Sequence, residues 1–189
     1  MGTRIGRPRS TALDASIAEA TLELLQEHGY AGLSFTAVAQ RAGTTTPALY
    51  RRYASKADLV VEVVFRVDGD DVVADTGDVD ADVRTMVRWA VEKFTAPGGR
   101  AALAGLLAEP VDPGQRRAPL LNVWRRIGAR IEQGVERGEL PPTADPHAAV
   151  LALAGPAVLA AAVLGPAAAS DEWVERLSTL ALDGIRGGR

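Results

Sequence analysis

The sequence predicts an all-α protein with nine helices, and three observations lead to this prediction. Along the 189 residues, Ser, Thr or Asp repeatedly precedes an apolar run at helical spacing, which a glycine then closes. Runs of alternating apolar residues bounded by hairpin turns are missing, so signals for strands are scarce. The hydrophobic fraction of 47% and the charged fraction of 24% are those of an ordinary globular protein.

The first helices of the chain are short and closely punctuated. Thr11 and Asp14 have the spacing of a capping box, in which each side chain satisfies a free backbone N–H, and Gly29 ends the helix that follows. Gly43 closes the second helix. Polar N-cap residues open the second, third and fourth helices: Ser34, Thr45 and Ser55.

Longer helices follow in the remainder of the chain. Asp112-Pro113 and Asp145-Pro146 each place an N-cap before a Pro at the first helical position, where the missing N–H costs nothing. Pro97-Gly98-Gly99 is expected to separate two helices, and Ser170 caps the last one. The nine predicted helices span residues 11–29, 35–42, 46–53, 55–73, 79–94, 100–107, 112–137, 145–164 and 170–184.

Charge divides the chain into a basic N-terminal part and an acidic remainder. Residues 1–56 hold seven basic and four acidic side chains, a net charge of +3, whereas the whole chain carries −3. A basic end on an acidic body indicates that one end meets a polyanion, although a charged run also fits an ordinary solvated face. We expect two domains, residues 1–54 with a basic N-terminal arm and residues 55–189.

The segment from Ser34 to Lys56 carries the features that point to a function. Two short helices joined at Ala42-Gly43-Thr44 predict a helix-turn-helix, because Gly43 supplies the permissive backbone that the turn requires. Apolar positions face inward, which leaves hydroxyl, phenol and basic groups outward for phosphates and base edges. The second helix of this motif, over residues 46–53, is about 12 Å long, which matches the width of the major groove. A helix-turn-helix that is only core structure is the alternative.

This segment resembles the DNA-binding domain of TetR-type (tetracycline-repressor-like) transcriptional regulators. The resemblance covers roughly residues 10–60 densely, and the rest of the chain agrees in helix count and layout. Its pattern is an apolar-Ala pair, an Ala-Gly turn, a Leu-Tyr pair, an aromatic and a Lys. The matching residues are Ile17, Ala20, Gly29-Tyr30, Val38-Ala39, Ala42-Gly43, Leu49-Tyr50, Tyr53 and Ser55-Lys56.

The resemblance implies that the third helix enters the major groove. By position, Thr46 and Pro47 would touch base edges, Tyr50 and Lys56 would clamp the phosphate backbone, and Arg52 would contact phosphate or base. Thr46 is shorter than the residue often found there, and Arg52 replaces a commoner aromatic or His. The operator sequence is therefore not inherited from the family. Other hydroxyls expected at the DNA are those of Ser34, Thr36 and Thr45.

The resemblance also implies a nine-helix TetR-like fold whose C-terminal domain binds a small apolar effector, which releases a repressor from DNA. No cofactor and no metal are expected. The candidate pocket residues are apolar or aromatic, although an amphipathic core stripe would select the same positions. They are Met86, Trp89, Phe94, Leu107, Leu120, Trp124 and Ile127.

The last two helices predict a homodimer, which would bind an inverted repeat in double-stranded DNA. The helix over 145–164 is apolar nearly all round, so one chain could bury both helices only with difficulty. Core packing within one chain is the alternative. A membrane span over 148–169 is disfavoured because Gly-Pro pairs interrupt it and neither flank is basic. The expected interface residues are Leu153, Leu159, Trp173, Leu177, Leu180 and Ala181.

Other classes of protein fit the sequence less well. Motifs of a nucleophile with its base, or of paired carboxylates, do not stand out, so we do not expect an enzyme. The acidic run from Asp68 to Asp82 lacks the Gly and the terminal Glu of an EF-hand. The N-terminus lacks the apolar stretch of a signal peptide, so we expect a cytoplasmic protein. A helical protein without DNA binding, either membrane-associated or a structural adaptor, is the remaining alternative.

Overall fold

The computed structural model describes the backbone of residues 11–65, 75–109, 118–166 and 170–187, and their side chains except at 118–123 and 161. Within these ranges the regular structure is helical and contains no strand, which confirms the all-α prediction. The helices are α1 (Thr11–Gly32), α2 (Phe35–Arg41), α3 (Thr46–Tyr50), α4 (Lys56–Val64), α5 (Val79–Thr95), α6 (Pro97–Ala108), α7 (Ala118–Glu136), α8 (Pro146–Val163) and α9 (Asp171–Ile185).

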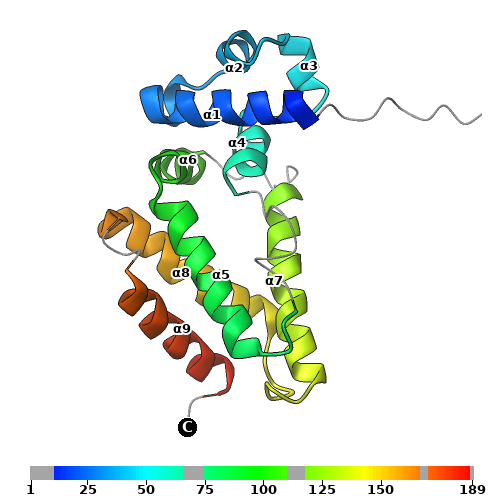
Figure 1. The fold of residues 1–189 in the computed structure, drawn as a ribbon, viewed down its shortest axis with the longest axis vertical. Coiled ribbons are helices and arrows are strands. Elements are labelled where there is room, and N and C mark those ends of the chain that lie inside the picture. Colours follow the sequence, from blue (N-terminus) through cyan, green and yellow to red (C-terminus); the bar gives the residue numbers. More distant parts are fainter. Residues whose placement is uncertain (1–10, 66–74, 110–117, 167–169, 188–189) are drawn as a thin grey trace, which may run out of the picture.

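The helices form two bodies stacked along the long axis of the molecule. At one end α1 lies crosswise beneath α2 and α3, and α4 leads away from them into the larger body (Figure 1). In that body α5 is central, with α7 and α9 on opposite sides and α8 crossing behind it (Figure 1). Helix α6 lies between the two bodies, where it packs against α1.

The smaller body is held by side chains from all four of its helices. Ile17 on α1, Val38 on α2, Leu49 on α3 and Leu59 on α4 are each completely buried. Burying side chains of this size stabilises the fold by about 1.5–3 kcal/mol each relative to exposing them. Three short helices therefore keep fixed positions that their own hydrogen bonds could not maintain.

Most of the described helix starts have the caps that the sequence predicts. Ser55 accepts a hydrogen bond from the N–H of Asp58 at 3.0 Å, and Ser170 accepts one from the N–H of Trp173 at 3.3 Å. Asp14, predicted in a capping box, instead pairs with a side chain of another helix, as shown below. The local sequence pattern therefore predicts a cap at Asp14, whereas the structure shows an ion pair with a residue far along the chain.

Helix α6 begins three residues earlier than the sequence pattern predicts. Pro97-Gly98-Gly99 forms its first turn instead of a separating loop. Pro is acceptable there because the first N–H groups of a helix have no partner within it. A Cβ added at Gly99 would lie 1.7 Å from the carbonyl oxygen of Lys93, so only glycine permits the tight passage from α5 to α6.

One predicted boundary is wrong and one falls outside the described residues. The fourth helix, expected to run towards Val73, ends at Val64, because Phe65 leaves the helical conformation with φ −104° and ψ 17°. The predicted start of the seventh helix at Asp112-Pro113 lies in 110–117. The end of α7 is described: the helix stops at Glu136, and Gly138 follows with φ +76°. A glycine was the expected stop signal at that point.

Candidate nucleic-acid interface and effector cavity

Helices α2 and α3 form the helix-turn-helix that the sequence predicts. Ser34 caps α2 and accepts the N–H of Ala37 at 3.2 Å, and Thr45 caps α3 and accepts the N–H of Ala48 at 3.4 Å. Between the helices Gly43 has φ +65°, a left-handed conformation that residues with a Cβ rarely adopt. The turn therefore fixes the angle at which α3 leaves α2.

The outer side of these two helices carries most of the side chains predicted to contact DNA. Tyr50 is 62% exposed, and its ring meets the edge of Phe35 at a centroid distance of 4.6 Å, so the exposed phenol has a braced position. Thr46 is half-buried. We call the exposed members of this set the DNA face: Ser34, Thr36, Thr45, Pro47 and Tyr50.

The third helix is shorter than the sequence suggests. Helix α3 has five residues, about 7.5 Å of axis, because the chain turns at Arg51 and Arg52 after Tyr50. The expected length of about 12 Å is therefore wrong for the regular helix. The exposed positions remain those of its first turn and of Tyr50, which leaves a compact surface.

Arg52 has an intramolecular partner in place of an exposed position beside the DNA face. Its guanidinium donates to the carboxylate of Asp14 on α1, and the two side chains are only 21% and 26% exposed. The guanidinium assigned by the sequence to a phosphate or base is thus engaged within the chain. The ion pair holds the end of α3 against the start of α1.

A second ion pair holds α2 against α1. Arg41 lies 2.8 Å from a carboxylate oxygen of Glu27 and 3.6 Å from one of Glu23. The hydrogen bond from Arg41 lowers the pKa of Glu27 below its ordinary value. Sequence reasoning did not single out Arg41, although carboxylates four residues apart on α1 were a visible sign of a charged helix face.

Lys56, at the start of α4, is held by the end of α1. Its ammonium donates to the carbonyl oxygen of Tyr30 at 3.2 Å and lies 4.1 Å from the centroid of the Tyr30 ring. The side chain is half-buried, so its charge faces solvent only in part. The structure thus places Lys56 beside the helix-turn-helix with its orientation already determined.

Arg51 is a cation that the resemblance did not assign to a DNA contact. It is exposed directly after Tyr50, and within the described part of the chain its guanidinium has no hydrogen bond or ion pair. Arg41 and Arg52 are paired with carboxylates, as described above. Arg51 is consequently the better placed of these three arginines for an external anion.

Tyr30 also connects the helix-turn-helix body with α6. Its hydroxyl donates to Glu109 at 2.7 Å, immediately after the end of α6. A Cβ added at Gly105 would lie 1.9 Å from Cγ of Tyr30, so the ring occupies the notch that the glycine leaves on α6. We call the set Tyr30, Lys56, Gly105 and Glu109 the Tyr30 contact.

The larger body contains a small cavity lined by most of the predicted effector residues. Its volume is about 30 Å³, the space of about one water molecule. Phe65, Val150 and Leu153 also line it. Leu107 lies elsewhere, 70% exposed on α6, and the side chain of Leu120 lies outside the described residues. The predicted residues that line this aromatic cavity are Met86, Trp89, Phe94, Trp124 and Ile127.

The residues predicted at a dimer interface divide into exposed and buried groups. Leu153, Leu177 and Ala181 are at most 6% exposed because they pack inside their own chain, which leaves little of each side chain to contact a second copy. Trp173 is half-buried, and Leu159 and Leu180 are exposed as expected. The exposed apolar side chains, which we call the α8–α9 patch, are Leu151, Leu159, Val163, Leu164 and Leu180.

The described part of the acidic run is engaged in contacts within the chain. Asp75 lies 2.7 Å from Arg137 and 3.1 Å from Arg130, Asp78 caps α5, and Asp80 pairs with Arg186. Among the described residues, groups of His, Cys, Asp or Glu that could hold a metal ion are not found. The helices of that part also include none that is long and apolar enough to span a bilayer.

The fold and the exposed face together define a class: a helix-turn-helix protein with hydroxyl and phenol groups exposed on and beside α2 and α3. The model for the family "Bacterial regulatory proteins, tetR family" matches residues 17–63. The model "Tetracyclin repressor-like, C-terminal domain" matches residues 73–181, more than half of the chain. The chain belongs to the TetR family, and it is a DNA-binding transcriptional regulator.

Curated relatives agree with this assignment over nearly the whole chain. The HTH-type regulator YdeS of Bacillus subtilis is 24% identical over 98% of this chain and 96% of its own length. The regulator AqdR of Rhodococcus erythropolis is 28% identical over 80% of this chain and 73% of its own length.

Solved structures share the fold. The TetR family transcription regulator SCO0332 has a TM-score of 0.66 at 27% identity, over 91% of this chain and 97% of that one. The regulator FadR of Bacillus subtilis, solved in complex with stearoyl-CoA, has a TM-score of 0.61 at 14% identity, over 93% and 99%. At 14% identity the latter similarity concerns the fold alone.

Proposed function

We propose that this regulator is a homodimeric repressor that acts in the cytoplasm and is released from an inverted-repeat operator by a small, largely apolar molecule. Its activity is binding and not catalysis. The observation that carries the proposal is the Tyr30 contact, which joins the helix-turn-helix body to α6 of the body that contains the aromatic cavity. A DNA surface and an internal cavity are thereby linked by packed side chains.

The DNA contacts follow from exposure and chemistry. Thr46 and Pro47 start α3 and would meet base edges or a thymine methyl group in the major groove. Tyr50 and Arg51 would contact phosphates from the end of α3, and Lys56 would do so from the start of α4. The hydroxyls of Ser34, Thr36 and Thr45 would add contacts around this surface. Arg52 is left out because Asp14 holds it.

The α8–α9 patch supports the homodimer. Leu151, Leu159 and Val163 recur at intervals of eight and four residues, so they lie along one side of α8, and Leu180 of α9 is 70% exposed. Large apolar side chains gathered on a surface indicate an interaction site. A two-fold axis through this patch would place two helix-turn-helix bodies on half-sites about 34–36 Å apart, or on a multiple of that spacing.

The aromatic cavity supports a proposal in which the effector moves helices apart when it binds. Small-molecule sites usually measure about 300–1,000 Å³, whereas this cavity has about 30 Å³. An effector between Trp89 and Trp124 would therefore displace the helices around it. Phe65, directly after α4, is one of the lining residues, and Lys56 is the first residue of α4. A displaced α4 would move the Lys56 ammonium relative to the DNA face.

Release by the effector requires a coupling free energy between the effector site and the operator. A 100-fold loss of operator affinity corresponds to a coupling free energy of about 2.7 kcal/mol, and the same factor must weaken the effector when operator is bound. Removal of one hydrogen bond of the Tyr30 contact, at about 0.5–1.5 kcal/mol, would supply part of it. Changes in the packing of α6 on α1 would supply the rest.

The proposal is tested with DNA that flanks the coding region of the protein. Fluorescence anisotropy over a range of salt concentrations should show specific binding, and Lys56→Ala should reduce the salt slope by about one without changing the preferred sequence. Thr46→Ala should instead change the preferred sequence, at about 1–3 kcal/mol for a lost base contact. Arg176→Ala, on exposed α9, is the control and should change neither quantity.

The effector part of the proposal needs a separate titration. Apolar compounds are screened by tryptophan fluorescence in a Trp173→Phe background, which leaves Trp89 and Trp124 as the reporters. A compound that quenches them should bind more weakly when operator is present. Equal affinity with and without operator would leave a DNA-binding regulator that this cavity does not control.

A further inference from the structure

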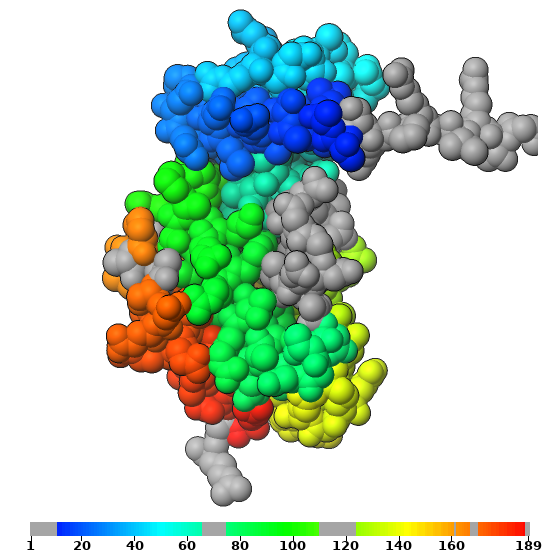
Figure 2. Space-filling model, in the orientation of Figure 1, coloured from blue at the N-terminus to red at the C-terminus, as the bar shows by residue number. Residues whose placement is uncertain are grey.

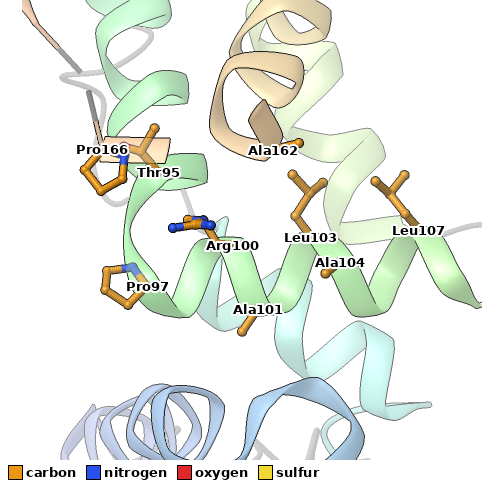
Figure 3. Close-up of a pocket in the computed structure, with 9 residues that line it drawn as sticks. All are labelled: Thr95, Pro97, Arg100, Ala101, Leu103, Ala104, Leu107, Ala162 and Pro166. Atoms are coloured by element: carbon orange, nitrogen blue, oxygen red, sulfur yellow. The ribbon is translucent and has the colours of Figure 1, made fainter. Parts of the chain in front are cut away.

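A second cavity, separate from the aromatic one, lies between α6 and the end of α8. Its volume is about 530 Å³, within the usual range for small-molecule sites. Leu103 of α6 lies opposite Ala162 with Leu107 one turn farther along, and Arg100 lies between these leucines and Pro166 (Figure 3). It shares no lining residue with the aromatic cavity. We call it the α6–α8 cleft.

The cleft is apolar except at one end, where it contains a cation. Among the described residues that line it, Arg100 alone is charged. Thr95, the other lining side chain with a hydrogen-bonding group, already donates its hydroxyl to the carbonyl oxygen of Val91 at 2.7 Å. Within the described part of the chain, Arg100 has no hydrogen bond or ion pair.

The position of the guanidinium depends on a glycine at the end of α8. Gly165 has φ +60°, and a Cβ added there would lie 3.4 Å from an Nη atom of Arg100. The backbone of this turn thus comes close to the guanidinium without enclosing it. The five N–H donors of an arginine form a planar fork that fits a carboxylate. No described side chain or backbone group accepts from those donors, so an anion in the cleft could use them.

Helical spacing aligns the cation with the apolar wall. Arg100, Leu103 and Leu107 are three and four residues apart, so they share one face of α6. About 10 Å of helix axis separates the first from the last, which matches an extended alkyl chain of roughly eight carbons. The opposite face of α6 carries Gly98 and Gly105, which lie against α1.

We propose that the α6–α8 cleft is a second ligand site, which binds an amphipathic carboxylate with its head group on Arg100 and its apolar chain along Leu103 and Leu107. This site is independent of the proposed effector in the aromatic cavity. The carboxylate replaces water as the hydrogen-bond partner of Arg100, and hydrogen bonds between two ionised groups are the stronger ones. Apolar surface at Leu107, now 70% exposed, is covered by the chain of the ligand.

The test uses sodium octanoate as the probe and the full chain as the protein. Isothermal titration calorimetry should show binding of octanoate, and Arg100→Ala should weaken it at least tenfold, whereas Arg100→Lys should retain part of the affinity. Octan-1-ol, which lacks the charge, should bind wild type and Arg100→Ala alike. Leu107→Asp should weaken both probes, and it replaces an exposed side chain, so the fold should persist.

Two further variants separate this proposal from its alternatives. Arg176→Ala, an exposed arginine on α9, should leave octanoate affinity unchanged. Trp89→Ala alters the aromatic cavity alone and should also leave it unchanged. Octanoate that binds wild type and Arg100→Ala equally, or that fails to bind at millimolar concentration, would overturn the assignment. If Trp89→Ala alone abolished binding, the carboxylate would occupy the aromatic cavity instead.

Discussion

At the scale of single residues, the cations around the helix-turn-helix differ in what holds them. Asp14 and the pair Glu23 and Glu27 on α1 engage Arg52 and Arg41, whereas Arg51 is exposed. The sequence pattern predicted a basic end but could not assign a partner to each charge. Exposure and partners show that some of these charges stabilise the domain and that others are available to DNA.

The first prediction concerns the ion pair between Arg52 and Asp14. Arg52→Ala and Asp14→Ala should each lower the free energy of unfolding, and a double-mutant cycle should give a coupling of about 0.5–1 kcal/mol, because the pair is partly shielded from water. Thermal or denaturant unfolding measures it. Arg52→Ala should keep the preferred DNA sequence. A coupling near zero together with a changed preference would restore Arg52 as a base contact.

The second prediction concerns Glu139, which accepts hydrogen bonds from Arg137 and, at 2.7 Å, from the N–H of Val79 at the start of α5. These bonds lower the pKa of Glu139 below its ordinary value of 4.5, Arg137 contributing most. The carboxylate therefore stabilises the fold fully above the ordinary pKa, and this contribution is lost as pH falls through the lowered pKa.

Glu139→Gln should accordingly lower the Tm at about pH 7 and approach wild type at about pH 3. The comparison is a thermal melt at both pH values. Glu136→Gln, an exposed carboxylate at the end of α7 and three residues before Glu139, serves as the control. A gap in Tm that stays constant from neutral to acid pH would show that Glu139 acts through packing and not through its charge.

At the scale of helices, the sequence predicts helix caps and ends from local residues, but it does not predict contacts between residues far apart in the chain. Gly43 and Gly138 have the positive φ that their stop signals imply, and Ser34, Thr45 and Ser170 cap their helices. These features depend on residues within one turn of the chain. The pairs Asp14–Arg52 and Tyr30–Glu109 are 38 and 79 residues apart, and composition or periodicity contains no signal for them.

The candidate sites show the same division. Helical spacing placed Met86, Trp89 and Phe94 on one side of α5, which suffices to bring them to one cavity. The exposed side of α8 depends on which neighbours cover it, so Leu153 could be told from Leu159 only with the packing known. The domain boundary at residues 54 and 55 stays a prediction.

The third prediction concerns the contact of α6 with α1. Gly105→Ala should destabilise the protein by about 1–3 kcal/mol, because the new Cβ would lie 1.9 Å from Cγ of Tyr30. Gly98→Ala is the matched control: its Cβ would lie 3.3 Å from Cδ2 of Leu22, the far end of a flexible side chain. Calorimetry should find Gly98→Ala close to wild type. Similar losses for both variants would argue against a specific notch for Tyr30.

At the scale of the whole molecule, the two bodies differ in what their surfaces offer. The helix-turn-helix body occupies one end, and α9 with the end of α8 lies in the other body on the side away from α7 (Figure 2). The proposed DNA contacts and the proposed dimer contacts therefore involve different helices. A substitution among the proposed dimer contacts is therefore expected to leave the helix-turn-helix body folded, and a substitution among the proposed DNA contacts to leave α8 and α9 in place.

The fourth prediction concerns the α8–α9 patch. Leu159→Asp and Leu180→Asp each place a charge on an exposed apolar side chain, so they should convert the proposed dimer to a monomer at micromolar concentration. Sedimentation velocity measures this, and operator affinity should fall with it. Thr85→Asp adds the same charge to an exposed position of α5 and is the control. Dimers that persist in both variants would place the interface elsewhere.

The seat of the Tyr30 ring on α6 has a mechanical consequence. A ring that fills a notch resists sliding of α6 along α1, because any shift would drive it into the neighbouring turns of the helix. Rocking about the ring keeps it seated. The helix-turn-helix body is therefore expected to rotate about Tyr30 as one rigid unit. A small rotation there becomes a larger displacement of α3, because α3 lies far from the Tyr30 ring.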